Sequence, residues 1–141
     1  MTDTFAKLYT QSAAGLEWVP AEMFALPEGC EYKIFKDDGG DGLRAVMVRF
    51  PPGYVEPEHQ HAMEHWGIVI EGEMHVDGKK LGPGDFHFAP ANVLHGPFYY
   101  PKGCIVFGTT HSFQPDGMRH DYTAEAAQAD PRDIEVSAAG A

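Results

Sequence analysis

The sequence predicts a single all-β domain that closes into a barrel. Its 141 residues are enough for one hydrophobic core and too few for two. The 16 glycines and 11 prolines fall between short runs rich in β-branched and aromatic residues, which is typical of strands joined by tight turns. No long helical pattern interrupts these runs. We therefore expect one domain over residues 1–141, with the barrel core at about 30–112.

Seven such runs are predicted to be strands. Asp77-Gly78 stands between two of them and is typical of a hairpin turn. The tail at about 124–141 is rich in alanine, and we expect it to be poorly ordered or to form a short helix over 123–129 capped by Thr123. The predicted strands are Glu31–Lys36, Leu43–Phe50, Trp66–Ile70, Glu73–Val76, Phe86–Ala89, Gly96–Tyr100 and Ile105–Thr109.

Composition and charge exclude several classes of function. Hydrophobic residues make up 43% and charged residues 22%, as in an ordinary folded protein. The formal net charge of −11 repels phosphate backbones and anionic lipid surfaces, so we expect neither nucleic acid nor a membrane as partner. The apolar runs are too short to span a bilayer and the N-terminus lacks a secretion signal, which indicates the cytoplasm. In that compartment Cys30 and Cys104 are expected to be two buried thiols.

The strongest functional signal is a group of four histidines. His59, His61 and His65 are separated by two and four positions, and residues at even spacing on a strand point to one face. His95 follows a turn-forming segment at 90–92, so a neighbouring antiparallel strand can bring a fourth imidazole to the same interior. Four neutral imidazoles that converge inside a barrel predict a site for one divalent transition-metal ion.

Other polar residues near these histidines are weaker candidates. An isolated histidine usually has a structural or surface role, and only the spacing of the four reverses that expectation. Acids around the first three histidines belong either to a solvated face or to the support of a ligand imidazole; these are Glu56, Glu58, Glu64 and Glu71. Four histidines have no partner at ligand spacing and are expected to be structural or exposed, namely His75, His87, His111 and His120.

Two motifs built on the four histidines resemble the two signatures of the cupin superfamily. In the first, histidine stands at position 65 where that family usually has glutamate. In the second, Asn92 replaces the usual glycine and Tyr99 the usual asparagine. The motifs are Gly53-x5-His59-x-His61-x3-His65-x6-Gly72 and Gly84-x5-Pro90-x-Asn92-x2-His95-x3-Tyr99, which together cover about a third of the chain.

This resemblance implies a cupin jelly-roll-like β-barrel with a metal at its centre, commonly in a homodimer. Histidine at position 65 is similar to the small four-histidine monocupins, which include manganese-binding oxidative members and a zinc-containing polyketide cyclase. Imidazole in place of a carboxylate leaves such a site one charge unit more positive, so enolates and carboxylates are expected to bind it better. An octahedral metal with four histidine ligands keeps two positions for a chelating substrate or dioxygen.

Residues that would act on a substrate are harder to identify. Alternation from His95 puts Tyr99 on the same inward face, which makes Tyr99 the candidate catalytic residue. The alternative is that Tyr99 only packs as an aromatic side chain, with its hydroxyl at the rim. Arg49 would clamp a carboxylate if it faced inward, although a surface arginine is the commoner case. The pocket is expected to include Phe50, Phe88 or Tyr99. No pattern indicates a phosphate-cradling loop or an organic cofactor.

We therefore expect a metal-dependent enzyme, foremost a dioxygenase-type oxidoreductase acting on a small enolisable ketone, β-dicarbonyl or aromatic substrate chelated to the metal. Iron or manganese is the favoured ion, with zinc, nickel, cobalt or copper as alternatives. Two other functions stay open. One is a redox-neutral cyclase, isomerase or lyase, in which the metal is a Lewis acid. The other is a non-catalytic cupin that senses a ligand or a metal, because one scaffold can host many functions.

Overall fold

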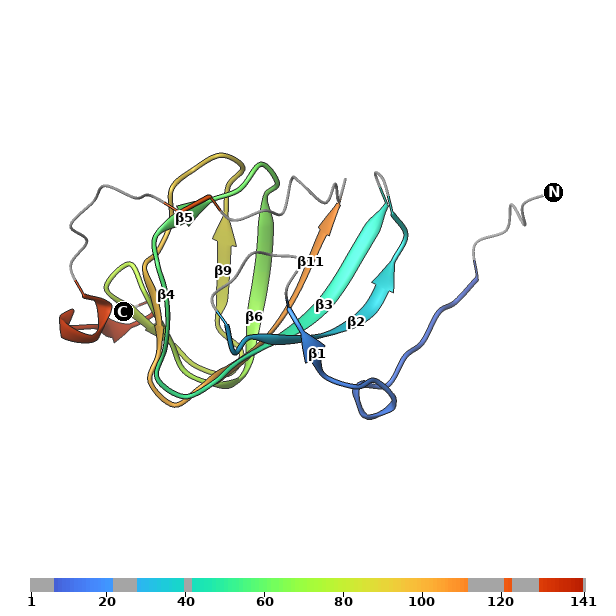
Figure 1. The fold of residues 1–141 in the computed structure, drawn as a ribbon, viewed down its shortest axis with the longest axis horizontal. Helices are drawn as coiled ribbons and strands as arrows, with labels where there is room; N and C mark the ends of the chain where they lie inside the picture. The colour runs from blue at the N-terminus through green and yellow to red at the C-terminus, as the bar shows by residue number, and fades with distance from the viewer. Residues whose placement is uncertain (1–6, 22–27, 40–41, 112–120, 123–129, 141) are drawn as a thin grey trace.

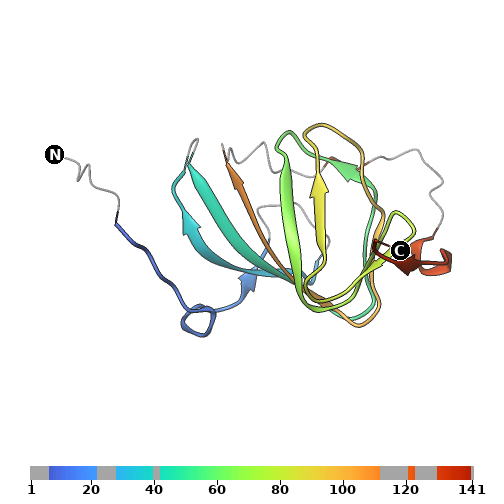
Figure 2. The same cartoon turned by 180° about the vertical axis from the view of Figure 1, so that it is seen from behind.

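The computed structural model describes residues 7–21, 28–39, 42–111, 121–122 and 130–140. Two β-sheets face each other and enclose the core (Figure 1 and, from behind, Figure 2). The first sheet has the order β1 (Val19–Pro20), β2 (Glu31–Asp37), β3 (Leu43–Phe50), β11 (Cys104–His111), β6 (His65–Gly72) and β9 (Phe86–Ala89). The second has the order β13 (Ser137–Ala138), β8 (Lys79–Leu81), β7 (Met74–Val76), β10 (Phe98–Tyr100) and β4 (Tyr54–Glu56).

Short elements complete the described part of the chain. A two-stranded ladder joins β12 (Asp121–Tyr122) to β5 (His59–Gln60), and the two short 3-10 helices are η1 (Ala13–Gly15) and η3 (Pro131–Asp133). None of the described helices has the length and apolar character needed to cross a membrane. The predicted all-β fold in a single domain is thus what the described residues form.

The core lies between the two sheets because alternate residues of each long strand point inward. On β3 the inward positions Val46, Val48 and Phe50 pair in register with Gly108, Val106 and Cys104 of β11. On β6 the inward position Val69 is fully buried, whereas its neighbour Ile70 is 48% exposed on the outer face. This period of two is the burial pattern expected of a sheet with one face covered.

All seven predicted strands are present; β3 and β9 have the predicted bounds, and the ends of the others are shifted by at most two residues. The hairpin prediction is confirmed, because Asp77 and Gly78 have φ of 52° and 67° and join the antiparallel pair β7 and β8. Strands β4, β5 and β8 were not predicted. Each has only two or three residues, which is too short for an alternating pattern to be visible in the sequence.

The tail differs from its prediction. Residues 130–140 contain η3 and β13, and β13 pairs in parallel with β8, so this part of the tail is packed on the barrel. Asp130 caps η3 by accepting a hydrogen bond from Arg132 N–H, and Pro131 is buried. The short helix expected over 123–129 falls outside the described residues.

The glycine that ends the first motif is required by its surroundings. Gly72 has φ +84°, and a Cβ at this position would stand 2.1 Å from the carbonyl oxygen of Gly103. This close approach ends β6 against the turn before β11.

The two cysteines are free thiols, and both are buried, as predicted. Burial raises the pKa of both thiols, to about 12 for Cys104, so they are uncharged at neutral pH.

Candidate metal centre

Three of the four predicted ligands converge. One ring nitrogen from each of His59, His61 and His95 lies within 4.8 Å of the other two. His59 and His61 are 2% and 1% exposed, and His95 is half-buried. The backbone holds them together, because His59 N–H donates to His95 O at 3.0 Å and His95 N–H donates to His59 O at 2.9 Å. The two motifs, 30 residues apart in the chain, therefore meet at this bridge.

Each of these three imidazoles is oriented by the same local device. Its Nδ1–H donates to the carbonyl oxygen of a residue two positions away, at 2.9 Å for His59, 2.5 Å for His61 and 2.7 Å for His95. The acceptors are Pro57, Met63 and Val93. With Nδ1 protonated, the lone pair of each neutral ring is on Nε2, the nitrogen that can coordinate a metal ion.

A metal ion would suit this arrangement. His95 Nε2 is buried and makes no hydrogen bond to any described residue, which is costly for a polar atom without a partner. Three imidazole nitrogens with no carboxylate among them favour an ion of the manganese-to-zinc series over calcium or magnesium. We therefore describe the three histidines as a candidate metal site.

His65 lies beside this cluster rather than in it. Its ring centroid is 4.6 Å from that of His61 and 6.0 Å from that of His95. It stands on β6, where Gly67 and Val69 share its inward parity. The described structure thus gives a three-histidine cluster, with the fourth predicted ligand adjacent to it.

One of the two residues that depart from the second cupin signature, Asn92, has a clear structural role. Asn92 has φ +56°, a left-handed conformation that asparagine tolerates better than most residues other than glycine. Its N–H donates to His61 O at 2.8 Å, which adds a second link between the two motifs. Asparagine therefore fills the role of the usual glycine here.

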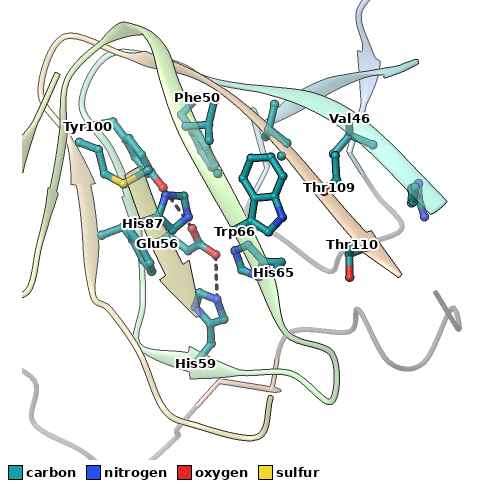
Figure 3. Close-up of a pocket in the computed structure, with 17 residues that line it drawn as sticks. Val46, Phe50, Glu56, His59, His65, Trp66, His87, Tyr100, Thr109 and Thr110 are labelled. Atoms are coloured by element: carbon teal, nitrogen blue, oxygen red, sulfur yellow. Dashed lines mark hydrogen bonds and ion pairs between the residues drawn. The ribbon is translucent and has the colours of Figure 1, made fainter. Parts of the chain in front are cut away.

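A cavity of about 100 Å³ opens beside the histidines, between the two sheets (Figure 3). Most of its lining is apolar, and His59 and His65 border it. Figure 3 shows Glu56, Tyr100 and His59 towards one end, and Val46 and Thr110 towards the other. The size suits a small molecule and excludes a polymer. The apolar lining residues include Val46, Val48, Phe50, Met74, Phe98 and Val106.

A buried carboxyl group is the polar feature nearest to the cluster. Glu56 is 4% exposed, and its Oε1 lies 3.3 Å from His59 Nε2. Tyr100 OH donates to Glu56 Oε2 at 3.5 Å. Burial raises the pKa of Glu56 to about 8, and the Tyr100 hydrogen bond opposes this rise only in part. Glu56 is thus placed against a histidine of the cluster, while the side chain of Glu64 is exposed.

Tyr99 lies outside the cavity, contrary to the predicted alternation. Its ring meets that of His75 at 5.6 Å, while Phe98 and Tyr100 on either side line the cavity. The alternation fails because β10 begins only at Phe98, and Gly96, with φ +98°, breaks the extended chain after His95. The neighbouring Tyr100 therefore takes the inward place that sequence reasoning assigned to Tyr99.

The remaining expectations have mixed outcomes. His87 lines the cavity and is not an exposed surface residue. Burial lowers its pKa to about 4, so its ring is neutral at pH 7. His75 binds Glu73 at 2.7 Å, as expected of a structural histidine, and His120 falls outside the described residues. Phe50 lines the cavity, but Phe88 is 50% exposed. Arg49 pairs with Glu31 at 2.7 Å on the outer face.

His87 was missed because its neighbours in the sequence carry no ligand spacing. It reaches the cavity opposite Gly67, with which it pairs in the β6–β9 register. A Cβ on Gly67 would stand 2.8 Å from His87 Cε1 and 2.6 Å from Val106 Cγ1. Glycine at this position therefore makes room for the His87 ring.

Comparisons with known proteins agree with this geometry. Residues 7–114 match the family model described as the ChrR cupin-like domain. The chain is 34% identical over 67 residues to dimethylsulfoniopropionate lyase DddQ of Ruegeria pomeroyi, a match that covers 44% of this chain and 33% of that protein. The chain thus spans about a third of the length of this curated relative.

Solved structures share the fold at lower identity. The acetylacetone dioxygenase of Acinetobacter johnsonii superposes with a TM-score of 0.59 at 16% identity, covering 79% of this chain and 77% of that one. The polyketide cyclase RemF of Streptomyces resistomycificus superposes with a TM-score of 0.63 at 17% identity, covering 86% and 89%. At such identities the likeness shows the fold alone.

Proposed function

The chain belongs to the ChrR cupin-like family and has the cupin jelly-roll barrel, and on that premise we propose that it is a metal-dependent enzyme of the dioxygenase type. Its proposed substrate is a small enolisable ketone or β-dicarbonyl. The observation that carries the proposal is the convergence of three Nε2 lone pairs beside a small apolar cavity that contains one buried carboxyl group.

The ligand set is proposed as His59, His61, His65 and His95. Ring nitrogens of the first, second and fourth lie within 4.8 Å of one another, and the His65 ring, on β6, is 4.6 Å from that of His61. A bound divalent ion supplies Lewis-acid chemistry, and iron or manganese supplies redox chemistry towards dioxygen as well. The apolar lining excludes water from the substrate, which strengthens every electrostatic interaction inside the cavity.

Glu56 is the residue we propose as proton acceptor. Its carboxyl group lines the cavity next to His59 and accepts a hydrogen bond from Tyr100, which fixes its direction. The carbon between two carbonyl groups is acidic enough for a carboxylate in such a position to take its proton. This step is common to oxidative and redox-neutral reactions of the same substrate class.

Oxygen uptake tests the oxidative reading. Protein loaded with iron or manganese is expected to consume oxygen in proportion to added acetylacetone, whereas protein loaded with zinc is expected to consume none, because zinc has no redox chemistry. An oxygen electrode and a metal analysis of each sample provide the measurement. Turnover by the zinc form under argon would contradict the dioxygenase proposal.

The second candidate is a redox-neutral lyase or cyclase. The buried Glu56 favours it, because a base beside a Lewis-acid site suffices for elimination or aldol-type closure without dioxygen. DddQ, the partial relative, is named as a lyase, and RemF as a cyclase. Activity of the zinc form under argon would establish this candidate. A metal-loaded protein that turns over none of these substrates would point to the third reading, a ligand or metal sensor.

We also propose that two copies associate through the outer face of β6 and β9. Phe86 and Phe88 are 58% and 50% exposed there, beside Ile70 at 48%. The Trp66 ring lies 6.1 Å from that of Phe86, so these apolar side chains form one surface. Exposed apolar groups that gather in this way commonly mark an interface. β9 is also the edge of its sheet among the described strands.

Substitution Phe88→Glu is expected to turn a dimer into a monomer, because it would bury an unpaired charge at the interface. Light scattering after size exclusion measures the mass against the 15.5 kDa of one chain. Ile134→Glu is the control, at a 38% exposed site that ends η3, which packs on β10 of the second sheet, and it is expected to leave the mass unchanged. A monomeric unsubstituted protein would contradict the interface.

The cytoplasmic location of the protein stays a prediction.

A further inference from the structure

The cavity has a buried cation at the end away from Glu56. Arg44 stands on β3, is 1% exposed and lines the cavity. It shares inward parity with Val46, Val48 and Phe50, which line the same cavity. Among the described lining residues Arg44 is the one with a permanent positive charge.

Keeping a guanidinium at this position is costly. Burial lowers the pKa of Arg44, and the charge of Asp37, which lies opposite it on β2, opposes this effect without reversing it. Asp37 itself is exposed, so its charge is screened by water. A guanidinium has five N–H donors, so one that borders the cavity can bind an anion there in addition to its other contacts.

The strand register gives the approximate separation of this cation from His65, which lies beside the candidate metal site. Arg44 pairs with Thr110 of β11, and Thr110 Oγ1 donates to the carbonyl oxygen of Glu64 at 2.9 Å, just before His65. Arg44 and His65 therefore stand in one row across β3, β11 and β6. Two strand spacings of about 4.8 Å place their Cα atoms about 10 Å apart. A molecule of a few carbons can thus reach both residues at once.

We propose that Arg44 binds a carboxylate of the substrate, so that the substrate is a chelating ketone or β-dicarbonyl that carries a carboxylate a few carbons from its chelating group. This inference rests on the proposed function, because it takes the metal end of the cavity as the site of chelation. A guanidinium and a carboxylate form two parallel hydrogen bonds, which fixes the substrate lengthwise in the cavity.

Two matched probes test the proposal. Both 4,6-dioxoheptanoate and heptane-2,4-dione carry the same 1,3-diketone, but only the first has a carboxylate. Titration of each into cobalt-loaded protein, followed by the visible spectrum of the metal, gives the two dissociation constants. We expect the carboxylate probe to bind about 10-fold or more tightly, as a charge-assisted bidentate contact allows. Equal affinities would overturn the Arg44 inference.

Variants assign the preference to the residue. Arg44→Gln is expected to abolish the preference while the affinity for heptane-2,4-dione stays unchanged, and Arg44→Lys is expected to keep part of it. Arg49→Gln, on the outer face of the same strand, is the control and is expected to keep all of it. A full preference in Arg44→Gln would overturn the inference. If Arg44→Gln fails to fold, the test is the preference for the carboxylate probe in the unsubstituted protein and its partial loss in Arg44→Lys. Absence of a spectral response to either probe would contradict the proposed function itself.

Discussion

Substitution of His61 by alanine is expected to remove most of the bound metal and to abolish the thermal stabilisation that the metal provides. His61 is 1% exposed and is one of the three histidines whose ring nitrogens converge, so its loss removes a central ligand. An ion that saturates the native site at about 1,000 times its dissociation constant stabilises it by about 4 kcal/mol. At about 2–4 °C per kcal/mol, this corresponds to a difference in melting temperature of about 8–16 °C between metal-loaded and chelated protein.

Melting curves with and without chelator, together with metal analysis, provide the measurement. Comparison of each protein with its own chelated form separates the metal effect from the packing lost with the imidazole. His75→Ala is the matched control, since His75 binds Glu73 and Tyr99 away from the cavity. Its metal content and its response to chelator are expected to equal those of the unsubstituted protein. Full metal content in His61→Ala would contradict the candidate site.

His65→Ala decides between three and four ligands. The His65 ring lies 4.6 Å from that of His61 but outside the convergent cluster. We expect its loss to weaken metal binding measurably, and less than the loss of His61 does. Unchanged affinity would leave a site of three histidines.

The histidine cluster could be predicted because its information is local. His59 and His61 are two residues apart, and strand parity alone sends both inward. The spacing of the second motif predicted that His95 joins the other histidines. The backbone bridge between His95 and His59 is the contact that brings it there. The long strands were also predictable, because six to eight residues are enough to display alternation.

The rest of the cavity depends on contacts that no local pattern contains. Tyr99 was placed inward by counting from His95, and the positive φ of Gly96 invalidates that count. Glu56 stands on a three-residue strand, where parity has too few positions to be recognised. Arg44 looks in the sequence like an ordinary arginine at a strand end, and its burial and its place in the cavity lining show that it faces the interior. Residues that act on the substrate come from several strands, so their convergence is a property of the topology.

Substitution of Glu56 by glutamine is expected to lower kcat by about 10²- to 10⁴-fold while the metal content stays unchanged, the usual loss when a positioned proton acceptor is removed. Glutamine keeps the shape of the side chain and can still accept from Tyr100 OH, so the fold and the cavity are preserved. Glu64→Gln, at an exposed site of the same segment, is the control and is expected to keep full activity. Loss of metal from Glu56→Gln would instead make Glu56 a ligand.

The pH profile of kcat gives an independent test of the same role. The basic form of Glu56 is the carboxylate, so the rate of a proton-abstraction step rises as the pH passes upward through its pKa. Burial raises that pKa to about 8 in the metal-free protein, and a bound cation lowers it, because it favours the carboxylate. The ascending limb is therefore expected at or below pH 8 in the unsubstituted enzyme and is expected to be absent from Glu56→Gln. An unchanged limb in the variant would assign the proton transfer to another group. His87 also lines the cavity, but burial lowers its pKa to about 4, so its own limb would lie near pH 4.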